Sequence, residues 1–87
     1  MHITIAGRVQ GVGFRWFVIS HARRFDLAGW VRNNPDGSVE LEAAGPAEHV
    51  RSLREHVATG PRGARVDSVA ELPITSLELS RPFDITR

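Results

Sequence analysis

HITIAGRVQGVGFRWFVISHARRF, residues 2–25, joins two hydrophobic periodicities through a short segment that contains two glycines. Apolar residues alternate with polar ones over residues 2–8, which predicts a strand with one buried face. From residue 14 onward the apolar spacing changes to three and four, which predicts a helix with one face on a core. Gly11 and Gly13 favour irregular backbone between these two elements. The apolar stripe of the predicted helix consists of Phe14, Phe17, Val18, Ala22 and Phe25.

The rest of the chain predicts one further helix and a series of strands. Turn residues at 35–37 (PDG) separate two short strands and make them a hairpin. The second helix is expected between the glycine–proline pairs at 45–46 and 60–61, with a buried stripe of Val50, Leu53 and Val57. Strands are predicted at 30–33, 39–43 and 66–72, with a short final strand at 83–86 whose pairing the pattern leaves open.

The order strand, helix, strand, strand, helix, strand is typical of a ferredoxin-like α+β sandwich (βαββαβ), in which two helices cover one face of an antiparallel sheet. Residues 1–87 are enough for one such domain and too few for two. In this layout the first two strands run parallel and the third lies between them. The carboxyl ends of the first two strands therefore point the same way, and the short final strand is an addition to the pattern.

Composition excludes several classes of function. The chain has no cysteine, which excludes disulfides, thiolate zinc sites and a cysteine nucleophile. Eleven arginines against ten acidic residues give a net charge of +1, so no strong field attracts nucleic acid. The longest apolar run, residues 16–19, is far shorter than the roughly 20 residues of a membrane span, and the early strand leaves no room for a secretory leader. We expect a cytoplasmic monomer with no nucleic-acid or membrane partner.

The segment before the first helix has the features of an anion site. A helix amino terminus presents unpaired N–H groups and partial positive charge, and Gly11 and Gly13 let the backbone approach a ligand. Arg15, in the first turn, can add a planar fork of donors that matches phosphate oxygens. The segment is neither a P-loop nor a dinucleotide fingerprint, because lysine is absent and Trp16 stands where a third glycine is needed. On this pattern alone, a solvated arginine beside an ordinary turn is the alternative.

Strand alternation selects a partner for this segment. Val31 and Asn33 share one face of their strand, and Asn34 belongs to the other. If Val31 faces the helices, Asn33 faces the start of the first helix. The ends of the first and second strands are two strand spacings apart, about 10 Å. We therefore expect Asn33, and not Asn34, to lie near Arg15.

Two separated motifs resemble the acylphosphatase family: GRVQGVGFR at residues 7–15 and GWVRN at 29–33. Both stand at the family's spacing, and the likeness extends to DGSVE at 36–40 and FDI at 83–85. The resemblance implies one acylphosphatase-like domain over residues 1–87, with a ferredoxin-like fold. It also implies a hydrolase that splits acyl phosphates into a carboxylate and inorganic phosphate without a metal or cofactor.

The resemblance also implies roles for individual residues. Arg15 matches the phosphate-binding arginine, and Asn33 matches the asparagine that orients the attacking water. The backbone amides that would form the phosphate cradle belong to Gln10, Gly11, Val12, Gly13 and Phe14. Neither motif holds a carboxylate or a histidine, so we expect the substrate phosphate to accept the water's proton. The chain departs from many relatives at its end, which lacks a terminal tyrosine.

Two other functions are considered. A similar domain begins the hydrogenase-maturation carbamoyltransferase, so the chain could instead be a non-catalytic module that binds carbamoyl phosphate or phosphate. RNA-recognition domains share the order of elements but stack bases on sheet aromatics, where this chain offers Trp30 beside Glu40 and Glu42. A catalytic or metal-binding histidine is not favoured. We expect His21 to be a surface or partly packed side chain, and His49 and His56 to lie two turns apart on a solvated face.

Overall fold

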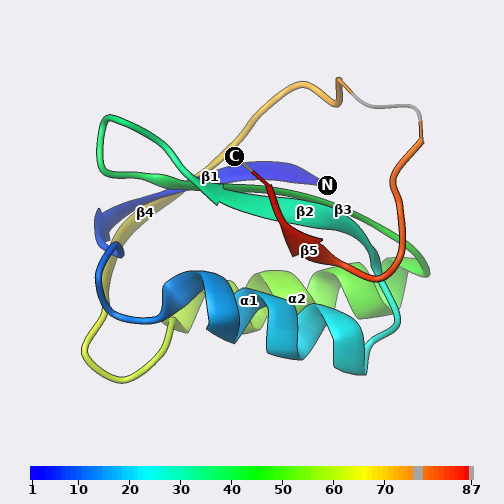
Figure 1. Ribbon diagram of the computed structural model, residues 1–87, viewed down its shortest axis with the longest axis horizontal. Coiled ribbons are helices and arrows are strands. Elements are labelled where there is room, and N and C mark those ends of the chain that lie inside the picture. Colours follow the sequence, from blue (N-terminus) through cyan, green and yellow to red (C-terminus); the bar gives the residue numbers. More distant parts are fainter. Residues whose placement is uncertain (76–77, 87) are drawn as a thin grey trace.

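The computed structural model has the expected order of elements, and it describes residues 1–75 and 78–86 (Figure 1). Both helices lie on one face of a single sheet, which gives the two-layer sandwich expected from the sequence. No helix in these two ranges is long and apolar enough to cross a membrane. The elements are β1 (His2–Arg8), α1 (Phe14–Arg24), β2 (Ala28–Asn33), β3 (Val39–Ala44), α2 (Ala47–Thr59), β4 (Arg65–Glu71) and β5 (Asp84–Ile85).

The strand order is β4-β1-β3-β2-β5, so β3 lies between β1 and β2 as expected. The first four strands pair antiparallel, but β5 pairs parallel with β2. The antiparallel sheet expected from the sequence is therefore confirmed for the first four strands. The pairing of the short final strand, which the sequence left open, is parallel. β4 and β5 lie at opposite edges of the sheet, and residues 72–75 after β4 run on the face of the sheet opposite the helices (Figure 1).

The core lies between the sheet and the helices. Ile3 and Ile5 in β1 are fully buried, as period-two alternation predicts, and Leu41 of β3 and Phe83 before β5 are equally buried. Burying each such side chain stabilises the fold by roughly 1.5–3 kcal/mol before the cost of ordering the chain. On α1 the buried residues include Ile19, which the predicted stripe lacked, while Phe17 and Phe25 are only partly buried at its border.

The opposite face of the sheet carries a polar network beneath the segment that follows β4. His2 donates from Nδ1 to the Pro73 carbonyl (2.7 Å) and from Nε2 to the Glu40 carboxylate (2.5 Å). Arg32 also donates to Glu40 (3.0 Å), and its guanidinium lies 5.2 Å from the centre of the Trp30 ring. Burial alone raises the pKa of Glu40, but the hydrogen bonds from its neighbours lower it below the usual value. This face is therefore occupied by paired charges.

Candidate active site

The segment between β1 and α1 takes its shape from two glycines. Gly11 and Gly13 have φ values of 75° and 78°, in the left-handed region that other residues rarely adopt. A Cβ on either glycine would meet no atom within 4 Å. The glycines are thus required by backbone conformation and not by lack of space, which agrees with the irregular segment expected from the sequence.

Gly13 is also the N-cap of α1, and it has no side chain with which to cap the helix. Among the described residues no side-chain cap hydrogen bond is formed there, and no acidic residue lies in the first turn. The first helical hydrogen bond runs from the Phe17 N–H to the Gly13 carbonyl (3.0 Å). The N–H groups of the first turn, together with the helix dipole, therefore remain able to bind an anion.

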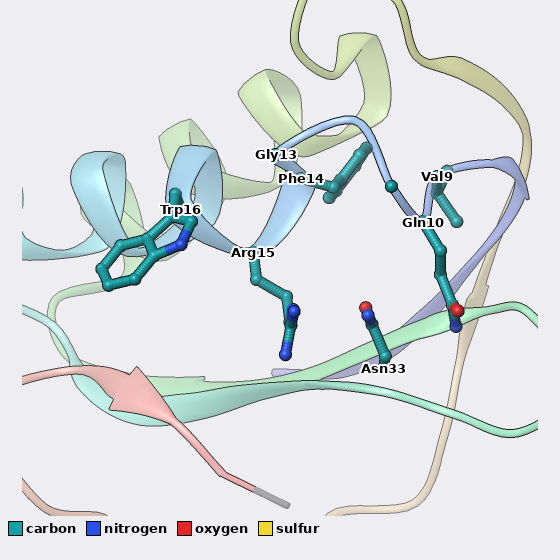
Figure 2. A pocket seen from close by; sticks show the side chains of 8 residues that line it. Val9, Gln10, Gly13, Phe14, Arg15, Trp16 and Asn33 are labelled. Atoms are coloured by element: carbon teal, nitrogen blue, oxygen red, sulfur yellow. The ribbon is translucent and has the colours of Figure 1, made fainter.

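Arg15 and Asn33 lie at one pocket of about 200 Å³ beside this terminus. Figure 2 shows the Arg15 side chain coming from the helix and the Asn33 side chain rising from the end of β2 toward the same space. Both side chains are partly buried. The full lining is Val9, Gln10, Gly11, Gly13, Phe14, Arg15, Trp16 and Asn33. The structure thus brings together the two side chains that sequence reasoning paired.

Asn34 faces away from the pocket, as alternation along β2 predicts. Its Nδ2 donates to Ser38 Oγ (3.1 Å) and to Glu40 Oε1 (3.1 Å), which belongs to the polar network on the other face. Val31, two residues before Asn33, is fully buried against the helices. The geometric reason for choosing Asn33 over Asn34 therefore holds.

The Gln10 side chain has a position that sequence reasoning missed, because only its backbone amide was considered. Its Nε2 donates to the carbonyl oxygens of Asn34 (2.8 Å) and Ser38 (2.9 Å). These two residues flank the turn between β2 and β3, where the Asn34 N–H also bonds the Ser38 carbonyl (2.8 Å). Gln10 thereby fastens the glycine-containing segment to the strand end that carries Asn33.

The remaining segment residues contribute differently. The Phe14 and Val9 side chains are 2% and 1% exposed, so they belong to the core more than to the pocket. Val12 does not line the pocket, and its side chain packs against the border of the core. Trp16 lines the pocket and is 64% exposed, a position that sequence reasoning did not assign.

The electrostatic character of the pocket comes from Arg15 and the helix terminus. None of the lining residues is a carboxylate or a histidine. The histidines lie elsewhere: His21 is partly packed and stacks on His56, with ring centres 4.0 Å apart, while His49 and His56 are exposed and stack on Phe25. Within the described ranges, no group of three or more histidine and acidic side chains could hold a metal ion. The pocket therefore offers donors for an anion and an amide for a polar ligand.

Fold and pocket together define a class of protein, which is a ferredoxin-like α+β domain with an arginine-containing pocket at the start of its first helix. The family model described as Acylphosphatase matches residues 1–85. The chain belongs to the acylphosphatase family, and the hydrolase assignment and the ferredoxin-like fold expected from the sequence are both confirmed.

Several relatives support this membership. An acylphosphatase of Bifidobacterium longum is 50% identical over 86 residues, which are 97% of this chain and 88% of that protein. One of Salinibacter ruber is 62% identical over 65 residues, 75% of this chain and 68% of that protein. The crystal structure of acylphosphatase from Bacillus subtilis has a TM-score of 0.91 at 42% identity and covers 99% of this chain and 96% of its own.

A longer protein also contains this fold. The crystal structure of full-length HypF in its phosphate- and nucleotide-bound form has a TM-score of 0.85 at 29% identity. The match covers 99% of this chain but only 11% of the HypF chain. The fold therefore also occurs as a small part of a much larger protein.

Proposed function

We propose that the pocket hydrolyses acyl phosphates to a carboxylate and inorganic phosphate, with Arg15 and the segment amides holding the phosphoryl group and Asn33 holding the attacking water. The observation that supports this most directly is that Arg15 and Asn33 share one pocket at an uncapped helix amino terminus. A dianion there meets a guanidinium, backbone N–H groups and a helix dipole at once.

Binding of the phosphoryl group falls to Arg15 and to the backbone from Gln10 to Phe14. A guanidinium can donate two parallel hydrogen bonds to phosphate oxygens, which fixes the orientation of the group as well as neutralising its charge. Donors already in place where charge develops need no reorganisation during the reaction. The hydrogen bonds of Gln10 to the turn after β2 hold these donors at a fixed distance from Asn33.

In this proposal Asn33 positions the attacking water. Its amide can orient a water but cannot take a proton near neutral pH. The water oxygen attacks phosphorus, and the bond from phosphorus to the bridging carboxyl oxygen breaks. Its electron pair leaves with the carboxylate, and the water proton passes to an oxygen of the transferring phosphate. This route needs no protein base, in keeping with a lining that has no carboxylate or histidine.

The alternative function is a non-catalytic module that binds carbamoyl phosphate or phosphate. The match to a small part of HypF is the observation in its favour. Turnover of benzoyl phosphate by the purified chain supports the enzyme, whereas binding without turnover supports the module. RNA binding has less support, because Glu40 and Glu42 lie buried on the sheet face where bases would stack and would repel phosphates.

The proposal includes one domain over residues 1–87 that acts as a cytoplasmic monomer. Every residue given a role belongs to one chain, so no second copy is required to complete the pocket. Among the described residues, the only large exposed hydrophobic side chains are Trp16 and Ile74, which offers little apolar surface for self-association. Sedimentation of the purified protein and fractionation of cells test these two points.

The decisive experiment compares steady-state hydrolysis of benzoyl phosphate by wild type, Arg15→Ala and Asn33→Ala. Each substitution is expected to reduce kcat/KM at least about 100-fold, because each removes a group that acts on the transition state. Arg15→Lys is expected not to restore the rate, since a point charge cannot make the two-pronged contact. Inorganic phosphate is expected to compete with substrate, and activity is expected to survive EDTA.

Asn34→Ala is the matched control, because it removes the neighbouring asparagine on the opposite face of β2. This variant is expected to keep kcat/KM near the wild-type value. Circular dichroism establishes that each variant is folded. A wild-type rate in folded Asn33→Ala would remove that residue from the mechanism, and strict metal dependence would contradict the proposed cradle.

A further inference from the structure

Trp16 is a large apolar side chain at the mouth of the pocket with no place in the core. It lies in the first turn of α1, outside the buried stripe of that helix, and 64% of it is exposed. Within the described ranges, the only other large exposed hydrophobic side chain is Ile74, which does not line the pocket. Packing therefore gives no reason for an indole at this position.

Trp16 is also the only lining residue that can offer apolar surface to a ligand. The other apolar side chains of the lining, Val9 and Phe14, are almost completely buried. Gly11 and Gly13 have no side chain, and the rest of the lining is polar. A substrate whose phosphoryl group fills the polar part of the pocket thus has one apolar surface available for its remaining part.

The geometry of phosphoryl transfer relates this surface to the leaving group. The attacking and leaving oxygens lie roughly in line on opposite sides of phosphorus. If the water is held by Asn33, the acyl oxygen points away from Asn33. In the view of Figure 2 the indole lies on the far side of Arg15 from Asn33. The acyl group is therefore directed toward the side of the pocket where Trp16 stands.

We propose that Trp16 forms the acyl subsite and that this chain prefers acyl phosphates with aromatic or bulky apolar acyl groups over acetyl phosphate. This inference rests on the function proposed above. An indole presents a broad, rigid face on which an aromatic ring stacks or an alkyl chain is shielded from water. A methyl group is too small to cover much of that face, so acetyl phosphate depends on the phosphoryl contacts alone.

The test measures kcat/KM for benzoyl phosphate and for acetyl phosphate in wild type, Trp16→Ala and Trp16→Phe. Trp16→Ala is expected to lose about tenfold on benzoyl phosphate and to change less than about twofold on acetyl phosphate. Trp16→Phe is expected to keep most of the preference, because an aromatic face remains. The inhibition constant of inorganic phosphate is expected to stay unchanged in both variants.

Ile74→Ala is the matched control, since it removes an equally exposed apolar side chain away from the pocket. It is expected to leave both substrates unaffected. Equal losses on both substrates in Trp16→Ala, or a weaker phosphate inhibition, would overturn the acyl subsite, because the indole would then support the phosphate-binding segment. No change on either substrate would overturn it as well. Failure of wild type to turn over either substrate would instead refute the proposed function.

A second readout does not depend on turnover. The chain has two tryptophans, and Trp30 lies on the other face of the sheet beside Arg32. In Trp30→Phe, Trp16 is the single fluorophore, and benzoylphosphonate is expected to shift or quench its emission while inorganic phosphate leaves it nearly unchanged. Equal responses to both ligands would contradict contact between the indole and the acyl group.

Discussion

Gln10 connects the two sides of the pocket through hydrogen bonds that any donor-free side chain would lose. Both hydrogens of its amide nitrogen are donated, one to the Asn34 carbonyl and one to the Ser38 carbonyl. Arg15 and the segment amides lie on one side of this connection and Asn33 on the other. The distance between the proposed phosphate-binding donors and the proposed water-holding amide thus depends on a residue that need not touch the reacting atoms.

Gln10→Glu tests this dependence with a side chain of nearly the same shape. The carboxylate would face two carbonyl oxygens with no hydrogen to donate, so we expect a loss of roughly 2–3 kcal/mol in unfolding free energy at pH 7. The loss relative to wild type is expected to shrink at lower pH, because a protonated carboxyl can donate one hydrogen bond. Urea unfolding at pH 7 and pH 5 measures both effects.

Gln10→Met serves as the control, because it removes the donors without adding charge. Its loss in unfolding free energy is expected to be smaller and independent of pH. If Gln10→Glu were as stable as wild type at pH 7, the connection across the pocket would not contribute to stability.

Arg15 and Asn33 could be predicted from the sequence, but the pocket role of Gln10 and the position of Trp16 could not. The position of Arg15 follows from the start of a helical pattern, and the direction of Asn33 follows from its place two residues after a buried valine on the same face of its strand. The Gln10 side chain reaches residues 24 and 28 positions away, and such contacts leave no periodic trace. The exposure of Trp16 likewise depends on which distant parts of the chain pack against α1, and the local sequence does not show this.

At the scale of elements, the two helices meet through stacked rings. His21 of α1 lies edge-on to Phe17 (4.5 Å between ring centres) and stacks on His56 of α2 (4.0 Å). The Nδ1 atom of His21 is buried and has no hydrogen-bond partner among the described residues. Burial, the neighbouring His56 and Arg24 together lower the pKa of His21.

This contact makes the packing of the helices sensitive to acid. A folded-state pKa below the unfolded value means that the unfolded chain binds the proton more readily. The contribution of His21 to stability is therefore complete above about pH 6.5 and declines as the pH falls toward the lowered pKa. His21→Phe keeps a ring in the stack without a titrating group, and its unfolding free energy is expected to fall less than that of wild type between pH 7 and pH 5.

Urea unfolding of both proteins across this range gives the comparison. His49→Phe is the control, because His49 is exposed and contacts Phe25 instead of His21. A pH dependence in His21→Phe as steep as in wild type would show that the stacked pair does not titrate with folding.

The ends of the elements were less predictable than their order. The sequence predicts that β2 starts at Trp30, but the strand begins at Ala28 and pairs there with β3. A Cβ at position 29 would lie 1.9 Å from the Glu42 carbonyl oxygen. Gly29 allows the backbones of β2 and β3 to approach closely. The amino-acid sequence alone does not reveal such an approach.

At the scale of the whole molecule, His2 connects its own strand, β1, to β3 and to the segment after β4. Its ring nitrogens donate to Pro73 after β4 and to Glu40 in β3, and its carbonyl accepts from the Leu72 N–H (2.8 Å). A carbonyl and a carboxylate can only accept, so both ring nitrogens must carry hydrogen. Burial opposes this charge, but the bonds to Glu40 and Pro73 outweigh it and raise the pKa of His2.

The stability that His2 contributes therefore changes with pH in the opposite direction to the stability that His21 contributes. A raised folded-state pKa gives stability that is fully present below about pH 6.5 and is lost as the pH rises through the raised pKa. His2→Gln is expected to cost about 2 kcal/mol in unfolding free energy at pH 6 and distinctly less at pH 9. Urea unfolding at both values measures the cost, and a cost that does not change with pH would show that the charged form is not stabilised.

The pairing of β5 could not be predicted from the sequence. Its two residues are too few to show a hydrophobic pattern, and their place beside β2 depends on Phe83 in the core and on the Thr86 N–H, which donates to the Val31 carbonyl (2.9 Å). The four-stranded antiparallel part was more predictable, because its strands lie beside a recognisable turn or helix and because β1 and β3 alternate apolar and polar residues.

The position of β4 at one margin of the sheet bears on how copies of this protein behave when they are crowded. An unprotected outer strand invites a neighbouring chain to add to it and so begins aggregation. Along β4, Arg65 and Asp67 alternate and pair with each other (3.0 Å), and Glu71 closes the strand. A chain joining there would have to strip water from these charges, and at the opposite margin β5 offers only two residues to join. Both edges of the sheet are thus protected against the addition of further strands, and this protection does not require another subunit.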